Sequence, residues 1–402
     1  MISRKLGLGL GLALTALFSP EHGILGVKDD EHVGDEVDQA THLRVTSLYG
    51  AKDSDKRPSH EALKGLDAVV IDLQDAGVRF YTYDTVVGYF LEAAAAERDQ
   101  YRHALEIVVL DRPNLIGGEA VQGPVSDANL ASYTDYMPLP ARFGMTIGEL
   151  ARYINGERRL ASPASPNVYA PLGVALTVVA AQGWARDEYY DHTGLPWINP
   201  SPNLRSVAAA VLYPGVGLTE TTNISVGRGT ERPFEQIGAC WTPGKSPAKP
   251  AGKGAAAVPC AAEDQIDGAK LAAYLTARKI PGVVFAPTSF AVAEDSNHYP
   301  GHGQTLNGIS ITTTDRKALD SPEMGIELLS ALAHLYPGRF NLAKAATLVA
   351  NVNTMRSLAN GDDPRTIAAG WSAELNDFKR RREAYLLYPS ATKDVPISQP
   401  SR

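Results

Sequence analysis

The sequence is poor in cysteine and has no excess of positive charge. Cys240 and Cys260 are its two cysteines, too few for a disulfide-rich scaffold or a cysteine-ligated zinc site. They can form one bridge in an oxidising compartment or remain two separate thiols. The formal net charge is −7, because 45 acidic residues outnumber 38 lysines and arginines. A surface that neutralises phosphates needs the opposite balance, so no nucleic-acid partner is expected.

Long hydrophobic runs are absent as well. No segment reaches the length of about 18 apolar residues that a membrane-spanning helix requires, so an integral membrane protein is not expected. Residues 1–16 carry two basic side chains and then a short run of apolar and glycine residues, the pattern of a signal peptide. A buried strand that includes residues 14–18 explains the same run equally well.

The remaining composition indicates a globular protein. The chain has 402 residues, of which 44% are hydrophobic and 21% are charged, so it can bury a substantial core. At roughly 100–200 residues per domain, this length predicts two domains. The texture of the sequence changes after a turn-rich break at residues 199–203. We therefore predict an N-terminal domain over residues 1–208 and a C-terminal domain over residues 209–402.

The N-terminal half predicts an α/β fold with a parallel sheet. Apolar runs at residues 68–73 and 106–110 flank residues 83–99, in which apolar side chains recur at helical spacing. Strand, helix and strand in this order form a βαβ unit. Residues 174–184 predict another buried element.

The C-terminal half predicts a smaller α+β domain. A short apolar helix is expected directly after the break. The later elements are expected as a helix at residues 269–278, strands at 282–285 and 308–313, and helices near 322–335 and 367–386. Residues 243–259 are rich in lysine, proline and glycine and predict a flexible surface loop.

Polar side chains follow the predicted strands of the N-terminal half. Glu21 follows the first apolar run, and residues 72–75 and 111–114 follow the next two. Because ligands of open parallel sheets bind beyond the carboxyl ends of the strands, these residues predict one cleft. Residues 111–114 also have the composition of an ordinary turn. No glycine-rich nucleotide motif follows a strand and nothing requires a metal, so no cofactor is predicted.

Three segments have the chemistry of a sugar-binding site. Glu21 and His22 place a carboxylate beside an imidazole at a tight turn, which suits general acid–base catalysis, although an incidental turn explains them equally well. Residues 78–83 combine an arginine with three aromatic rings that can pack on the apolar face of a sugar; core packing is the competing explanation. Arg228 lies between two glycines, where the backbone allows a ligand to approach closely.

Taken in order, the motifs resemble those of one family. They are LFSPEHGILG, SLYG, DLQDAGVRFYTY, LDRPNLIGG, GMTIGELA, NPSPN, LYPGVGLTETTNISVGRGTERPFEQIGA and YLLYP. This set is similar to the exo-β-N-acetylmuramidase (NamZ-type) glycoside hydrolases. The resemblance implies a Rossmann-like N-terminal domain without a nucleotide and a smaller C-terminal domain. It also implies release of terminal N-acetylmuramic acid from the non-reducing ends of peptidoglycan fragments, in an extracytoplasmic (periplasmic or secreted) setting.

The motifs also supply the candidate site residues. The candidate catalytic residues are Glu21, His22 and Asp72. The candidate substrate-binding residues are Gln74, Asp75, Arg79, Tyr81, Tyr83, Asn203, Glu220, Asn223, Arg228 and Glu231.

A glycosidase usually needs two carboxyl groups beside the bond that it cleaves. We expect Glu21, buried at its strand end, to be the general acid. Asp72 is the first choice for the partner and Glu231 the second, unless the 2-acetamido group of the sugar acts as nucleophile. Arg79 or Arg228 is expected to bind the lactyl carboxylate that distinguishes muramic acid from glucosamine.

The sequence departs from the family pattern at its start. The family normally has a further strand and helix before the Pro-Glu-His-Gly motif, whereas sixteen residues precede Leu17 here. Either this first βα unit is missing, or the start lies inside a longer reading frame, or residues 1–16 replace the unit. A non-catalytic glycan-binding protein is therefore the alternative function. An esterase or amidase is disfavoured, because no Gly-x-Ser-x-Gly motif follows a strand.

Overall fold

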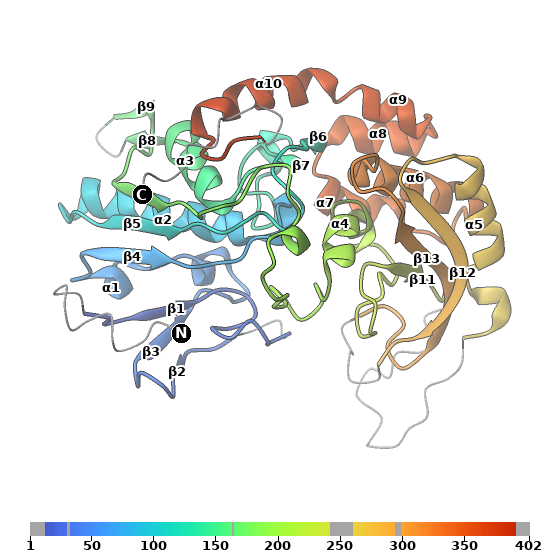
Figure 1. Cartoon of the computed structure of the whole chain (residues 1–402), viewed down its shortest axis with the longest axis horizontal. Helices are drawn as coiled ribbons and strands as arrows, with labels where there is room; N and C mark the ends of the chain where they lie inside the picture. The colour runs from blue at the N-terminus through green and yellow to red at the C-terminus, as the bar shows by residue number, and fades with distance from the viewer. Residues whose placement is uncertain (1–12, 30–32, 163–164, 242–259, 294–298, 391–402) are drawn as a thin grey trace, which may run out of the picture. The chain divides into compact units, whose positions relative to one another are not determined.

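The computed structural model describes residues 13–29, 33–162, 165–241, 260–293 and 299–390 (Figure 1). The chain forms two compact units, each assembled from several segments. The first unit comprises Met1–Asp72, Val86–Leu110 and Ile154–Val179, and the second comprises Leu73–Thr85, Asp111–Tyr153 and Ala180–Arg402. The expected loop at residues 243–259 and most of the expected signal segment lie outside the described residues.

The first unit contains two three-stranded sheets. In one sheet, β1 (Leu17–Ser19) pairs in parallel with β3 (Arg44–Ser47), which pairs antiparallel with β2 (Glu36–Val37). In the other, the parallel strands β4 (Ala68–Ile71), β5 (Glu106–Leu110) and β10 (Leu176–Val179) lie in the order β10-β5-β4. The α/β class and its parallel sheet are thus confirmed. A Rossmann-like arrangement stays a prediction.

Helix α2 (Tyr83–Gln100) connects β4 to β5, as the spacing predicts. The part of α2 in the first unit contacts the β1-β3-β2 sheet, where Phe90 meets Phe18 of β1 edge-on with ring centroids 5.4 Å apart. The short helix α1 (His60–Leu63) precedes β4. The prediction of a buried element at residues 174–184 is wrong: β10 is an edge strand, and its side chains alternate between half-buried and exposed.

Helix α3 (Ile147–Glu157) crosses one boundary between the units, because the second unit includes residues up to Tyr153 and the first resumes at Ile154. It follows the short antiparallel pair β6 (Gln122–Val125) and β7 (Pro140–Arg142). A hairpin of β8 (Arg159–Ser162) and β9 (Ser165–Pro171) comes next and was not predicted.

The rest of the second unit is an antiparallel sheet with helices. Strands β11 (Gln236–Gly238), β12 (Val283–Ala291) and β13 (Thr305–Thr313) lie in the order β11-β13-β12. The helices are α4 (Val207–Val216), α5 (Gly268–Ala277), α6 (Ser321–Leu335), α7 (Ala346–Val349), α8 (Val352–Asn360), α9 (Pro364–Ala369) and α10 (Ser372–Arg382). The predicted helix at residues 367–386 is therefore wrong as one element. It is divided at Gly370, whose N–H caps α9 by donating to the carbonyl groups of Thr366 and Ile367.

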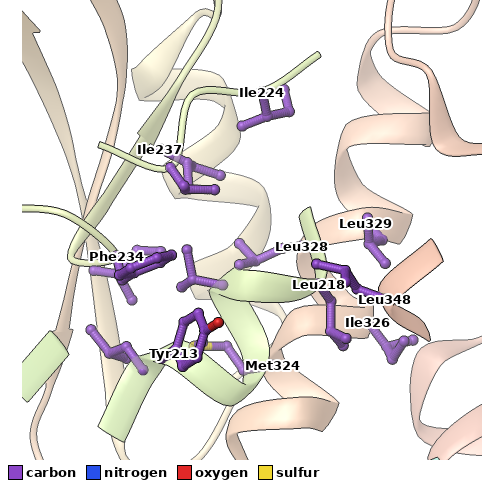
Figure 2. Close-up of a cluster of buried hydrophobic side chains, with 14 of the residues drawn as sticks. Tyr213, Leu218, Ile224, Phe234, Ile237, Met324, Ile326, Leu328, Leu329 and Leu348 are labelled. Carbon is purple, nitrogen blue, oxygen red and sulfur yellow. The ribbon is translucent and has the colours of Figure 1, made fainter. Parts of the chain in front are cut away.

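The core of the second unit joins these helices to the sheet (Figure 2). Tyr213 of α4 packs on Phe234 with ring centroids 4.6 Å apart, and Met324 and Leu328 of α6 are fully buried beside them. Helices α4 and α6 approach closely because they meet at glycines: a Cβ atom on Gly325 would lie 2.4 Å from the carbonyl oxygen of Gly215. Phe234 follows Arg228 and Glu231 in the chain, so its burial in this core anchors the segment that carries them.

Cys240 and Cys260 form a disulfide, with Cα atoms 6.0 Å apart. The sequence allowed either one disulfide or two separate thiols, and the structure contains the disulfide. In the described part of the chain, no helix combines the length and apolar character needed to cross a membrane.

Candidate functional site

The predicted site residues divide between the two units. The candidate catalytic residues Glu21, His22 and Asp72 belong to the first unit. The candidate substrate-binding residues all belong to the second unit. Each group is therefore described within its own unit.

Glu21 lies on a tight turn directly after β1. The N–H of Gly23 donates to the carbonyl of Pro20 (3.2 Å), and the N–H of Lys28 donates to the carbonyl of His22 (3.0 Å). Gly23 has a φ of +75°, a conformation that glycine adopts without strain. The Glu21 side chain is half-buried rather than buried, so it is more accessible than the sequence predicted.

Tyr49 is a partner of Glu21 that the sequence analysis did not select. Its hydroxyl donates to the Oε1 atom of Glu21 at 3.0 Å. Tyr49 belongs to the SLYG motif after β3, and the motif was the available signal. The contact between Tyr49 and Glu21 depends on the pairing of β1 with β3, which the motif alone does not show.

His22 holds the other end of the turn. Its φ of +74° is unusual for a residue with a side chain. Its Nδ1 atom lies 2.7 Å from the carbonyl oxygen of Lys28, and because a carbonyl only accepts, Nδ1 carries the proton. The Nε2 atom is then the basic nitrogen of the neutral ring. Lys28 is anchored in turn by an ion pair of 2.6 Å with Glu36.

The two candidates for the second carboxylate differ in their surroundings. Asp72 is exposed directly after β4, the position that a ligand-binding residue of a parallel sheet occupies, and it belongs to the same unit as Glu21. Glu231 has a side chain that is 96% exposed and lies 3.3 Å from Arg205 at the surface. Asp72 therefore shares a unit with Glu21, whereas Glu231 belongs to the second unit.

In the second unit, the loops that begin at residues 73 and 111 lie side by side. The Gln74 side-chain amide donates to the carbonyl of Pro113 at 3.0 Å. Gly77 allows this approach, because a Cβ atom there would lie 2.6 Å from the Asn114 side chain. The recess between these loops has no interior volume that a water molecule could occupy. Typical ligand sites enclose roughly 300–1,000 Å³, so these loops pack against each other without forming a pocket of that kind.

Asp75 is the buried carboxyl group of this recess. One of its oxygens accepts the N–H of Gly77 at 2.6 Å. Burial raises the pKa of Asp75 to about 7, although the N–H groups of Gly77 and Ala76 lower it. Near neutral pH this carboxyl group can therefore gain or lose a proton.

The side chains of Asp111 and Asn114, which follow β5, form buried hydrogen bonds with other segments of the second unit. Asp111 accepts hydrogen bonds of 2.6 Å from the hydroxyl groups of Thr146 and Tyr388. Asn114 donates to the carbonyl of Met145 at 2.7 Å. Tyr388 belongs to the late YLLYP motif, so that motif closes a buried hydrogen-bond network in the second unit.

The aromatic segment at residues 78–83 lies in the interior. Tyr81 and Tyr83 are buried and pack edge-on, with ring centroids 4.9 Å apart. Arg79 is 0% exposed. Its guanidinium is paired with Asp135 at 3.1 Å and donates to the carbonyl groups of Leu348 and Val349. Its bonds are those of a structural residue.

Arg228 belongs to a polar network that is partly open to solvent. It pairs with Glu220 at 2.6 Å, and its side chain is 26% exposed. Its guanidinium also lies 5.2 Å from the ring centroid of Tyr299 and donates to the Tyr299 hydroxyl at 3.4 Å. The same hydroxyl accepts the Asn203 side-chain amide at 2.9 Å. Three predicted binding residues thus meet around Tyr299, which the sequence analysis did not select.

The polar side chain of Asn223 connects two loops. It donates to the carbonyl of Arg339 at 2.8 Å and accepts the N–H of Asn341 at 2.9 Å. Both ends of its amide are therefore used in the fold. No cluster of three or more His, Cys, Asp or Glu side chains suited to a metal ion occurs among the described residues.

Comparison with known proteins gives one consistent result. The model described as "Exo-beta-N-acetylmuramidase NamZ, N-terminal" matches residues 5–208, and the corresponding C-terminal model matches residues 211–388. The peptidoglycan beta-N-acetylmuramidase NamZ of Bacillus subtilis (strain 168) is 33% identical over 381 residues, which is 94% of this chain and 80% of that protein.

Two crystal structures of DUF1343 family proteins from Bacteroides fragilis NCTC 9343 are similar in fold. One has a TM-score of 0.74 and 29% sequence identity, covering 93% of this chain and 86% of the other. The second has a TM-score of 0.65 and 24% identity, covering 96% and 89%, and supports the fold alone.

Proposed function

The chain belongs to the exo-β-N-acetylmuramidase NamZ family and is a glycosidase, and we propose that it releases terminal N-acetylmuramic acid from the non-reducing ends of peptidoglycan fragments. The observation that carries the proposal is the match of both family domains over nearly the whole chain. The half-buried carboxyl group of Glu21 on its turn supplies the chemistry.

We assign the role of general acid to Glu21. In this step the Glu21 carboxyl proton moves to the glycosidic oxygen while the bond to the anomeric carbon breaks, and the bonding electron pair stays on that oxygen. Asp72 is the proposed second carboxylate, which either activates the attacking water or orients the 2-acetamido group. His22 is proposed to act next to Glu21, with Nε2 as its basic atom.

We assign recognition of the lactyl carboxylate to Arg228. The two arginines predicted for this role differ in access, because the side chain of Arg79 is 0% exposed and that of Arg228 is 26% exposed. Glu220 and Tyr299 fix the orientation of the Arg228 guanidinium, and Asn203 fixes Tyr299. A planar, oriented guanidinium is well suited to a carboxylate.

The Cys240–Cys260 disulfide supports an extracytoplasmic location. Disulfides persist in oxidising compartments and are rare in the cytosol. We therefore propose that the protein acts in the periplasm or outside the cell, where peptidoglycan fragments are found.

The proposed activity is tested by incubating the protein with the disaccharide N-acetylmuramyl-β-1,4-N-acetylglucosamine and with a chromogenic N-acetylmuramic acid β-glycoside. We expect release of N-acetylmuramic acid from both, measured by chromatography and by absorbance. The N-acetylglucosamine β-glycoside with the same leaving group is the matched control and should react poorly. Binding of the disaccharide without release would instead support a glycan-binding protein.

Replacing Arg228 by alanine is expected to raise KM for the muramic acid glycoside by about 10–100-fold, the cost of losing one hydrogen bond to a charged group. The weak reaction of the glucosamine glycoside should change much less, because that substrate has no lactyl carboxylate. Arg232→Ala is the control, since Arg232 lies in the same loop with a side chain 50% exposed. Equal losses on both glycosides would refute the assignment of Arg228.

A further inference from the structure

The position of Tyr49 follows from the register of two parallel strands. Ser19 of β1 pairs with Ser47 of β3, and the N–H of Leu48 donates to the carbonyl of Ser19 at 2.8 Å. Glu21 and Tyr49 are each two residues beyond this pair. They therefore emerge from the same edge of the sheet, and the Tyr49 hydroxyl reaches Glu21 Oε1 at 3.0 Å although 28 residues separate them in sequence.

Hydrogen bonds around Ser47 hold the backbone that carries Tyr49. The N–H of Tyr49 donates to the Ser47 hydroxyl at 3.2 Å, and the N–H of Ser47 donates to Asp35 at 2.8 Å. After Tyr49 the chain continues through Gly50, where a Cβ atom would lie 2.8 Å from the Cβ of Asp55. Since the Glu21 turn is also closed by backbone hydrogen bonds, both ends of the tyrosine–glutamate contact are fixed.

A phenol that donates to a carboxyl oxygen restricts the rotation of that carboxyl group. A general acid works well only when its proton points at the leaving-group oxygen, so a fixed orientation increases the rate of proton transfer. The same hydrogen bond becomes stronger when the acid has given up its proton, because its acceptor then carries a charge. Tyr49 itself transfers no proton in this scheme.

We propose that Tyr49 is a positioning residue, which orients the Glu21 carboxyl group and stabilises the carboxylate that remains after proton transfer. This inference rests on the proposed function, in which Glu21 is the general acid. The Tyr49 hydroxyl acts through Glu21.

The test uses two leaving groups of different basicity. A sugar leaving group needs a proton as the bond breaks, whereas a dinitrophenolate leaves without one, so only the first reaction depends on the general acid. In Tyr49→Phe we expect kcat on the disaccharide to fall about 10–100-fold and kcat on the dinitrophenyl glycoside to fall less than about threefold, with KM nearly unchanged. Equal losses on the two substrates, or no loss on either, would overturn the proposal.

Two controls separate this proposal from its premise. Tyr169→Phe removes the hydroxyl of a tyrosine that is 62% exposed in the same unit and should leave both rates unchanged. If Glu21 is the general acid, Glu21→Gln must lower kcat on the disaccharide much more than kcat on the dinitrophenyl glycoside. If Glu21→Gln shows this unequal loss of kcat and Tyr49→Phe does not, the role of Tyr49 is refuted and the proposed function stays intact.

A double variant gives an independent check. If Tyr49 acts through Glu21, adding Tyr49→Phe to Glu21→Gln should lower kcat on the disaccharide by less than about twofold further. A further loss as large as that of the single Tyr49→Phe variant would mean that the two residues act separately, which would overturn the proposal. The thermal unfolding midpoint of each variant shows whether it folds.

Discussion

Glu21→Gln is expected to lower kcat on the disaccharide by about 10²–10⁴-fold, the range that general acid catalysis contributes. Glutamine has nearly the same shape, and its carbonyl oxygen can still accept the Tyr49 hydroxyl, but its amide cannot donate a proton to a glycosidic oxygen. The loss is measured as the rate of N-acetylmuramic acid release under saturating substrate. The thermal unfolding midpoint should stay close to that of the unmodified protein.

Glu61→Gln is the matched control for this experiment. Glu61 belongs to the same unit and has a side chain that is 79% exposed in α1. We expect its turnover to stay within about twofold of the unmodified protein, because an exposed carboxylate of this kind contributes little to the fold. A Glu21→Gln variant that keeps most of its turnover would refute Glu21 as the general acid.

Arg79→Met is expected to lower the free energy of unfolding of the second unit by about 3–5 kcal/mol, the cost of breaking a buried ion pair from one side. The substitution leaves Asp135, which is 1% exposed, without its 3.1 Å partner. It also leaves the carbonyl groups of Leu348 and Val349 without the guanidinium that binds them. Urea unfolding monitored by tryptophan fluorescence measures the effect.

Two further variants identify the cause of this loss. Arg205→Met removes an arginine from a surface pair with Glu231 and should cost about 0–1 kcal/mol. Replacing Asp135 by leucine together with Arg79→Met should recover much of the stability, because no uncompensated charge then stays buried. If Arg79→Met kept its stability and lost selectivity for muramic acid, the lactyl role would belong to Arg79 after all.

Local pattern predicted much of the fold. The apolar runs at residues 68–73 and 106–110 and the helical spacing between them correspond to β4, β5 and α2. These elements are encoded by neighbouring residues, so periodicity alone detects them. Prediction failed where a distant contact decides. Among the described residues, β10 pairs with β5 alone and its other edge is open, so its side chains are half-exposed. Trp371 is the N-cap before α10, and its indole N–H donates to Thr354 in α8.

The candidate site shows the same division. The motifs led to Glu21, Arg228, Glu220 and Asn203, and the last three meet in one network. They did not indicate Tyr299, which joins that network from about 70 residues further along the chain. Nor could residue type show that Asn223 uses both ends of its amide in the fold.

By itself, the sequence determined the α/β class, with a parallel sheet built from the apolar runs at residues 68–73 and 106–110. It also determined the family, through motifs that recur in order. Only the tertiary structure decided that Arg79 is an interior residue, bound to carbonyl groups about 270 residues away, and that Tyr49 reaches Glu21. The physical reason is that burial and strand register depend on which distant segments meet, and no local pattern records that choice.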